Sequence, residues 1–270
     1  MKKKCILVTG AYGGMGVEVA GLLSERGFLV FALDRKVGEA ADNIIADNII
    51  PVEADITDPE SVKKAFSAVS AYTDELYAIL HFAGVYMLDS LVEMGDEAFQ
   101  RIFDVNVRGA FLVNKAFIPM LRRGSRILIT TSELAPLDPL PFTGIYAVTK
   151  AALDKYAYSL RMELQLLGID VCVLRAGAVK TSMLGVSTVH LDRFCESTKL
   201  YSCNAARFKK IVGRVEARCI PPRKIAEKSA KILGKKKPAF AYTINRNPLL
   251  LLLNMLPKRL QLWAIKMVLR

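Results

Sequence analysis

The residues of this sequence best suited to chemistry are a tyrosine and a lysine four positions apart, Tyr146 and Lys150. On a helix this spacing puts both side chains on one face, where an ammonium beside a phenol favours the ionised phenol. Such a pair can act as an acid/base near neutral pH. Ser132 lies fourteen positions upstream, and its hydroxyl can hold a substrate oxygen while Tyr146 exchanges a proton with it. Taken alone, a Tyr–Lys pair at this spacing is more often a solvated helix face.

A glycine-rich turn near the N-terminus gives this pair a context. The apolar residues 4–8 predict a buried strand, and residues 9–16 follow it directly and lead into a helical pattern. Gly10, Gly14 and Gly16 allow a tight turn and let a pyrophosphate approach the amides at the helix N-terminus. A strand, a glycine turn and a helix in this order predict a dinucleotide-binding site.

The choice of dinucleotide depends on the end of the next strand. Residues 28–33 predict a second buried strand that ends at Asp34. A carboxylate at this place accepts hydrogen bonds from ribose hydroxyls and repels a 2′-phosphate, so NAD is favoured. Arg35 is the counter-argument, because a guanidinium beside the pocket suits a phosphate. Gly13 adds no basic side chain, and we therefore predict NAD, with NADP as the alternative.

The glycine turn together with Ser132, Tyr146 and Lys150 resembles the classical short-chain dehydrogenase/reductase family over roughly residues 1–185. The resemblance implies an NAD(P)-dependent alcohol dehydrogenase or ketoreductase. Lys150 would lower the phenol pKa and hold the ribose, and Asn106 would hold a water that links the lysine to solvent. The implied cofactor contacts are Gly10, Tyr12, Gly14, Met15, Gly16, Asp34, Arg35, Asp55, Ile56, Ala83, Gly84, Tyr146, Lys150, Gly177, Val179 and Thr181.

Three of these residues have further implied roles. By resemblance, Asp55 meets the adenine amino group, while the Val179 backbone and the Thr181 side chain hold the nicotinamide carboxamide. Independently of the family, Asp58 or Thr57 can cap a helix that begins at residue 59, and both functions can hold at once.

The sequence also departs from the family pattern. The catalytic serine of the family most often lies thirteen positions before the tyrosine, which here is Glu133; since a carboxylate cannot replace the hydroxyl, we retain Ser132. His81 and Phe82 stand where two asparagines are usual, and Ala176 stands where a proline is usual. We expect His81 to be a packed residue at a strand end and not a metal ligand.

The predicted fold is a doubly wound, Rossmann-type α/β domain with a mostly parallel sheet of about seven strands and helices on both faces. Residues 37–50 predict a loop or a poor helix. Further strands are expected at residues 51–54, 78–82, 127–129 and 169–174, and helices from residue 59, over 96–120, over 151–167 and over 222–233.

Composition limits the class of protein. Hydrophobic residues make up 52% of the 270-residue chain, which predicts one globular domain over residues 1–270. We find no apolar run of eighteen residues and no cleavage site after the N-terminal lysines, so neither a spanning helix nor a signal peptide is expected. Five cysteines without paired or metal-like spacing predict reduced thiols, a cytoplasmic protein and no metal site.

The net charge of +12 is concentrated towards the C-terminus. From Lys199 onward 18 Lys and Arg stand against two Glu, a balance of +16. Such an asymmetry is typical of proteins that bind a membrane surface, an anionic substrate or nucleic acid, and it also occurs where a charged face is simply solvated. Aromatic residues are not interleaved with these charges, and nucleic acid is not predicted as a partner.

Residues 187–270 are expected to form a helical substrate lid and an amphipathic C-terminal segment. A run of leucines at 249–253 is followed by a helical pattern with Leu260, Trp263 and Met267 on one face. This helix can pack on its own domain, which we favour, cover the substrate pocket or make peripheral contact with a membrane.

This tail resembles the retinol and 17β-hydroxysteroid dehydrogenase branch of the family. The resemblance implies a bulky lipophilic alcohol or ketone as substrate, steroid-like or retinoid-like, and a homodimer or homotetramer. An NAD-binding regulatory protein with little turnover is the alternative function.

Overall fold

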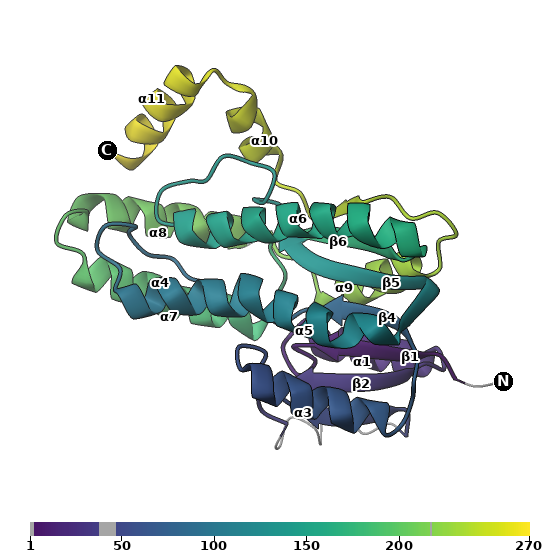
Figure 1. The fold of residues 1–270 in the computed structure, drawn as a ribbon. Helices are drawn as coiled ribbons and strands as arrows, with labels where there is room; N and C mark the ends of the chain where they lie inside the picture. Colours follow the sequence, from purple (N-terminus) through teal and green to yellow (C-terminus); the bar gives the residue numbers. More distant parts are fainter. Residues whose placement is uncertain (1–2, 38–46, 217) are drawn as a thin grey trace.

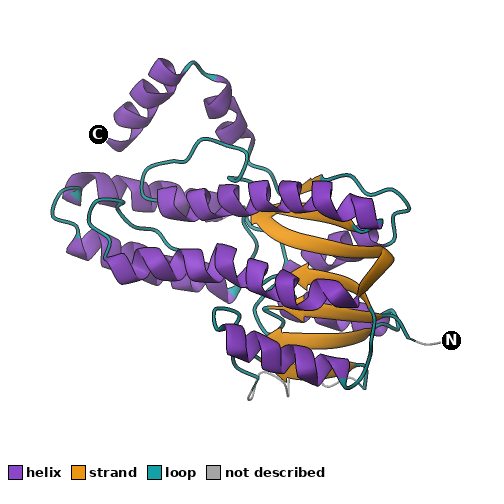
Figure 2. Ribbon diagram, in the orientation of Figure 1, coloured by secondary structure: helices purple, strands orange, loops and turns teal. Residues whose placement is uncertain are grey.

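The computed structural model describes residues 3–37, 47–216 and 218–270. The described residues form a seven-stranded sheet in the order β3-β2-β1-β4-β5-β6-β7 with helices on both faces (Figures 1 and 2). All neighbouring strands are parallel, so the predicted doubly wound fold is confirmed. The strands are β1 Cys5–Thr9, β2 Leu29–Asp34, β3 Ile49–Glu53, β4 Leu76–His81, β5 Leu121–Ser132, β6 Asp170–Ala176 and β7 Ala241–Ile244.

The helices divide between the two faces of the sheet. On one face α1 (Gly16–Glu25) and α9 (Pro222–Leu233) share an apolar core with the strands. On the other face lie α3 (Pro59–Ser70), α5 (Gly109–Phe117) and α6 (Gly144–Leu164). The remaining helices are α4 Asp96–Phe103, η1 Asp104–Arg108, η2 Ile118–Met120, η3 Gln165–Leu167, α7 Ser182–Ser197, α8 Ser202–Glu216, α10 Pro248–Met255 and α11 Lys258–Leu269.

The central strands are apolar because both of their faces are covered. Ile6, Leu7 and Val8 alternate between the two cores and have no solvent exposure. A strand that is buried on both sides reads as a continuous hydrophobic run, which is why residues 4–8 were recognisable in the sequence.

The carboxyl ends of the parallel strands meet at one edge of the sheet. β1, β2, β4, β5 and β6 end there at Thr9, Asp34, His81, Ser132 and Ala176. The strand order reverses between β1 and β4, and the crevice at such a switch point is where open parallel sheets bind ligands.

The helix predicted over residues 96–120 is interrupted. Residues Asp104–Arg108 form a π-helical turn between α4 and α5, and Asn106 is buried within it. π-turns of this kind are frequent at functional sites because they re-aim one side chain into the protein. Asn106, which falls in the middle of the helix predicted over residues 96–120, therefore lies in a turn of different geometry.

Several boundaries differ from the sequence prediction. β3 begins at Ile49, two residues before the expected strand, and β5 extends to include Ser132. The lid helix α7 begins at Ser182 and not near residue 187. β7 had no recognisable signal because it is only four residues long. Most of the expected loop or poor helix over residues 37–50 lies outside the described residues.

The C-terminal helices extend away from the sheet at the top of Figure 1. Leu260, Trp263 and Met267 are exposed, and Gln261 is the buried residue of α11. α11 packs on its own domain, as favoured from the sequence, but it does so through Gln261, Ile265 and Leu269. The face that the sequence pattern indicated is not the one that makes this contact. No helix among the described residues has both the length and the apolar character needed to cross a bilayer.

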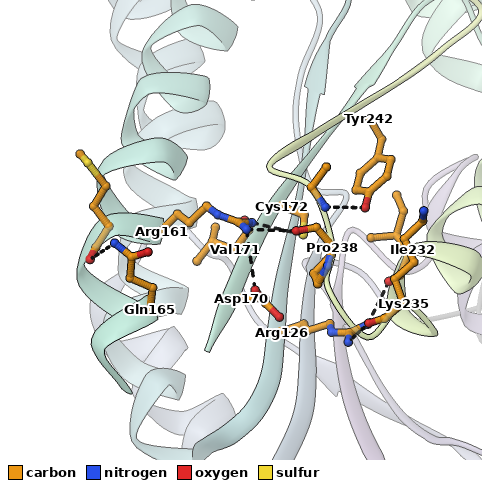
Figure 3. Close-up of polar contacts among 12 residues, drawn as sticks. Arg126, Arg161, Gln165, Asp170, Val171, Cys172, Ile232, Lys235, Pro238 and Tyr242 are labelled. Atoms are coloured by element: carbon orange, nitrogen blue, oxygen red, sulfur yellow. Dashed lines mark hydrogen bonds and ion pairs between the residues drawn. The ribbon is translucent and has the colours of Figure 1, made fainter. Parts of the chain in front are cut away.

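Two arginines attach the segment before β7 to the sheet (Figure 3). The buried guanidinium of Arg126 on β5 donates to the carbonyls of Ile232 (2.9 Å), Leu233 and Lys235. Arg161 on α6 donates to the carbonyls of Val171 at 2.6 Å and Pro238 at 3.0 Å. A cation among the last carbonyls of α9 also complements the negative end of the helix dipole.

Replacement of this buried guanidinium tests its contribution to stability. Arg126→Met should lower the free energy of unfolding by about 3 kcal/mol, because charged hydrogen bonds to buried carbonyls are lost. Arg123→Met, at an exposed position of the same strand, should change it by less than about 0.5 kcal/mol. Urea denaturation of both variants measures the difference. Equal stability of the two variants would contradict the anchoring role.

Candidate active site

A cleft of about 1170 Å³ opens at the carboxyl edge of the sheet. It is larger than most pockets for small ligands, which suits an extended ligand such as a dinucleotide. The predicted cofactor residues that line it are Gly10, Gly14, Met15, Gly16, Asp34, Arg35, Asp55, Ile56, Ala83, Gly84 and Thr181. Tyr12, Gly177 and Val179 are not among the residues that line it.

The glycines of the first turn are required by close contacts. Gly10 has φ +66°, and a Cβ there would lie 2.5 Å from the backbone nitrogen of Ala83. A Cβ on Gly14 would lie 2.6 Å from the Thr181 Cβ, and one on Gly16 would lie 2.0 Å from the Gly10 carbonyl oxygen. The turn therefore packs directly against the end of β4 and against Thr181. It forms a cradle of backbone amides at the start of α1 that fits a pyrophosphate.

Asp34 fixes the glycine turn to the end of β2. Its Oδ2 accepts a hydrogen bond from the Tyr12 backbone at 3.0 Å, and its Oδ1 accepts one from the Arg35 backbone at 2.7 Å. A carboxylate has about four acceptor sites, so capacity remains for ribose hydroxyls. Arg35 lines the same cleft. The cleft therefore contains both the carboxylate that would bind the ribose hydroxyls of NAD and the guanidinium that would bind the 2′-phosphate of NADP.

Asp55 and Asp58 have separate roles. The Asp55 Oδ1 accepts from the Thr57 backbone at 2.8 Å and from the Thr57 hydroxyl at 2.7 Å. Burial raises the pKa of Asp55, but these hydrogen bonds and the charge of Arg35 outweigh it and bring the pKa below its usual value. Asp58 caps α3 by accepting from the Glu60 and Ser61 amides, both at 3.1 Å. The capping function falls to Asp58, and Asp55 remains in the wall of the cleft.

Tyr146 and Lys150 lie on α6 beside a side cavity of about 20 Å³ that shares Met15, Phe82, Gly84 and Val85 with the main cleft. The Lys150 Nζ is 5.8 Å from the centre of the Tyr146 ring and donates to the Thr130 carbonyl at 3.3 Å.

The charge states of this pair differ from the expectation. Burial raises the pKa of Tyr146 to about 12, although a hydrogen bond with Ser132 lowers it in part. Burial also lowers the pKa of Lys150 to about 8. The predicted lowering of the phenol pKa is not seen: burial is the largest cause of the shift, and the hydrogen bond with Ser132 offsets it only in part. At neutral pH the phenol is therefore a proton donor.

The structure places Ser132, and not Glu133, against Tyr146. Ser132 is the last residue of β5, and its hydroxyl hydrogen-bonds Tyr146 and accepts from the Leu134 amide at 3.2 Å. Glu133 is buried, and its Oε2 accepts from the Asn247 backbone at 2.6 Å. The carboxylate at the more usual serine position is thus used to hold the C-terminal segment.

Asn106 braces the chain after β4. Its Oδ1 accepts from the Val85 amide at 2.8 Å, and its Nδ2 donates to the Val85 carbonyl at 3.0 Å and to the Thr149 hydroxyl at 3.1 Å. A Cβ on Gly84 would lie 3.2 Å from the Asn106 Oδ1 and 3.4 Å from the Lys150 Nζ. The Asn106 amide and the Lys150 ammonium therefore both lie close to Gly84, and Asn106 fixes one wall of the side cavity through Val85.

The loop from Gly177 to Thr181 is held by neighbouring backbone. A Cβ on Gly177 would lie 1.9 Å from the Asn245 carbonyl oxygen, so no larger residue fits there. Val179 is buried and pairs with Ile220 in an isolated parallel bridge. Of the three, Thr181 alone reaches the wall of the cleft.

Sequence reasoning missed two residues next to the catalytic candidates. The Tyr86 ring makes an edge-to-face contact with the Tyr146 ring, with the ring centroids 4.5 Å apart. The Asp154 carboxylate accepts from the Thr131 hydroxyl at 3.2 Å and from Arg175 at 3.0 and 2.6 Å. Asp154 follows Lys150 by four residues, and this spacing was a usable signal. Nothing in the sequence points to Tyr86.

His81 is a packed residue, as expected. Its Nε2 is 2.9 Å from the Asn114 Oδ1, and burial lowers its pKa to about 4. Within the described parts of the chain, no group of three His, Cys, Asp or Glu side chains is arranged to hold a metal ion.

Comparison with known proteins agrees with this geometry. Residues 4–190 match the family model described as short chain dehydrogenase. The chain belongs to the short-chain dehydrogenase family. The structure resembles that of a short-chain dehydrogenase from Streptomyces avermitilis, with a TM-score of 0.75, 21% identity and coverage of 90% of this chain and 88% of that one.

Two curated relatives are informative. Mouse estradiol 17-beta-dehydrogenase 2 is 34% identical over 68% of this chain, but the match spans only 50% of that protein. The 3-ketodihydrosphingosine reductase of Bacteroides thetaiotaomicron is 27% identical over 89% of this chain and 87% of its own length. Both relatives are named as a dehydrogenase or a reductase.

Burial of Lys150 predicts a dependence of stability on pH. Its pKa falls from 10.5 to about 8 on folding, so the folded state carries a penalty that is full below pH 8 and is relieved as the pH rises towards 10.5. Lys150→Met should therefore raise the free energy of unfolding at neutral pH by up to about 3 kcal/mol, and the gain should shrink above pH 8.

Urea denaturation across this pH range measures the effect. Lys155→Met, an exposed lysine on the same helix, should show no comparable gain. A destabilised Lys150→Met protein at neutral pH would mean that the ammonium is well compensated in the folded state.

Proposed function

We propose that this enzyme transfers hydride between NAD(H) and a bulky, lipophilic secondary alcohol or ketone, steroid-like or retinoid-like. The observation that carries the proposal is the half-buried Tyr146 side chain, hydrogen-bonded to Ser132 and one helical turn from Lys150. A bound nicotinamide supplies or accepts the hydride. The side chains of this protein must then hold the reacting oxygen and move its proton.

In the reductive direction, Tyr146 donates its phenolic proton to the ketone oxygen while the Ser132 hydroxyl holds that oxygen in place. The phenol is protonated at neutral pH, and burial, which raises its pKa to about 12, favours this form further. The Lys150 ammonium stabilises the phenolate that is left, since charges interact strongly in a buried pocket. Asn106 fixes the wall of the side cavity near Gly84. We propose that it also holds a water molecule through which a proton returns from solvent.

Each part of the cofactor has residues that fit it. The glycine turn would hold the pyrophosphate, and Asp34 would hold the adenosine ribose. The adenine would lie by Asp55 and Ile56, and Lys150 would hold the nicotinamide ribose. Contacts to the nicotinamide would come from Ala83, Gly84, Gly177, Val179 and Thr181. Support for NAD comes from the charge of Asp34 in the cleft wall.

The lipophilic substrate is supported by the lid helices. α7 and α8 pack on Phe142, whose ring lies 4.7 Å from Phe194 and 5.2 Å from Phe208. Phe142 precedes Tyr146 by four residues and has φ +63°, a strained conformation for a bulky side chain. The names of the two relatives include estradiol and 3-ketodihydrosphingosine, which are both lipophilic.

We also propose that the enzyme is a cytoplasmic homodimer or homotetramer with peripheral membrane contact. Exposed Phe111 on α5 and Tyr158 and Met162 on α6 are apolar groups that a symmetric contact would cover. The free thiols fit a reducing compartment. Peripheral contact is supported by the exposed apolar side chains of α11.

The serine assignment has a direct test. Ser132→Ala should lower kcat by about 100-fold or more, with little change in the dissociation constant of NADH, because the hydroxyl acts on the substrate oxygen. Glu133→Gln, the matched control, should retain most of kcat. Steady-state kinetics with a panel of ketones, together with NADH titration, gives both quantities.

Near-native turnover of Ser132→Ala would refute this role and direct attention to Thr131. Tight NADH binding by the unmodified enzyme without turnover of any alcohol or ketone would favour the regulatory alternative.

Cofactor preference follows from Asp34. The enzyme should bind NADH more tightly than NADPH, and Asp34→Asn should narrow or reverse the gap, since it removes the charge but keeps an acceptor for the Tyr12 amide. Fluorescence titration with both cofactors measures the ratio. A tenfold preference of the unmodified enzyme for NADPH, about 1.4 kcal/mol, would instead indicate that Arg35 binds the 2′-phosphate and determines the cofactor preference.

A further inference from the structure

The C-terminal helix pair, α10 and α11, exposes apolar side chains on both of its members. None of the residues of α10 is buried. Eight large apolar side chains are more than half exposed: Leu249, Leu252, Met255, Leu260, Leu262, Trp263, Met267 and Val268. Surfaces of this kind on otherwise soluble domains mark contacts with other molecules or membranes.

The charge of this part of the chain is of one sign. Residues 228–270 contain ten Lys and Arg and no Asp or Glu. On α11, Lys258 pairs with Asp138. Arg259, Lys266 and Arg270 make no ion pair with any residue that the structure describes. Three cations therefore remain available beside the exposed apolar side chains.

We propose that the C-terminal helix pair is a docking surface for an anionic lipid bilayer. Interfacial helices combine leucine and tryptophan side chains that enter the acyl boundary with lysine and arginine that meet anionic headgroups. α10 has eight residues, a length of about 12 Å against a hydrocarbon core of about 30 Å. The pair therefore lies in the interface and does not span the membrane.

Charge favours a bilayer over a second copy of this chain. A symmetric contact through this surface would bring Arg259, Lys266 and Arg270 close to the same cations of the other copy. The absence of any acidic residue from 228 to 270 leaves this repulsion uncompensated within the surface. Anionic headgroups neutralise it.

The docking surface is held against the loop between Ser132 and Tyr146 (Figure 1). The Asp138 amide donates to the Asn254 side chain at 2.8 Å, and the Asp138 carboxylate accepts from Gln261 at 3.1 Å. Asn247, the N-cap of α10, donates its backbone amide to Glu133. A docked bilayer would therefore lie beside the loop that directly follows the proposed catalytic serine at the end of β5. Entry of substrate from the lipid is the one part of this inference that rests on the proposed function.

Trp263 provides a direct readout, because it is the only tryptophan in the chain. Full-length protein is mixed at low salt with vesicles of phosphatidylcholine and phosphatidylserine in equal amounts, or of phosphatidylcholine alone. The mixed vesicles should shift Trp263 emission to shorter wavelength and make it sensitive to brominated acyl chains. Added salt should weaken the effect, since headgroup attraction is screened.

Variants separate the two contributions. Lys266→Glu with Arg270→Glu should weaken binding to the mixed vesicles by at least about 25-fold, whereas Lys64→Glu on α3 should change it little. Leu252→Ser with Met255→Ser should also weaken binding. Its control is Leu166→Ser, at a residue of η3 that is 79% exposed.

Unchanged Trp263 emission with the mixed vesicles, or equal binding by the α11 and α3 charge variants, would overturn the proposal. A change of oligomeric mass caused by Leu252→Ser with Met255→Ser, without any vesicle effect, would assign the surface to a second copy. Vesicle binding needs neither cofactor nor substrate. Absence of turnover would therefore refute the proposed reaction and leave the docking surface unaffected.

Discussion

Lys150 is buried and Tyr146 is half-buried one turn away on α6, and the rest of the site is arranged around this pair. Hydration stabilises both an ammonium and a phenolate. Its loss therefore raises the pKa of Tyr146 and lowers the pKa of Lys150. The phenol is thereby held as a proton donor. The Lys150 ammonium loses its proton more easily than an exposed lysine does, so the groups around it determine its protonation state.

Buried polar groups next to this pair connect the elements that carry chemistry. Asp154 joins α6 to β5 through Thr131 and to β6 through Arg175. Asn106 joins the π-turn to the chain after β4. Because unpaired polar groups are costly inside a protein, these contacts allow little freedom. The helix, the serine strand and the loop to Thr181 are therefore fixed relative to one another.

The segment between Ser132 and Tyr146 also fixes the position of the C-terminal helices. Glu133 and Asp138 are its two carboxylates that reach α10 and α11. Glu133 stands where the family more often has its serine, and this departure is explained by its bond to the Asn247 amide. The exposed apolar side chains of the helix pair are consequently held near the catalytic loop and not at a distant edge of the molecule.

The sequence by itself determined the doubly wound sheet, because strands that are buried on both faces are uninterrupted apolar runs. The glycine turn between the first strand and the first helix is a further signal of this fold. It also determined which residue types meet at the carboxyl edge, since Tyr146 and Lys150 share a helix face and Asp34 ends a strand. Only the tertiary structure decided the direction of the pKa shifts, the choice of Ser132 over Glu133, and the edge-to-face contact of Tyr86 with Tyr146. It alone decided that α11 leaves its apolar face in solvent. These features depend on depth of burial and on contacts between residues far apart in the chain, and neither is encoded in local spacing.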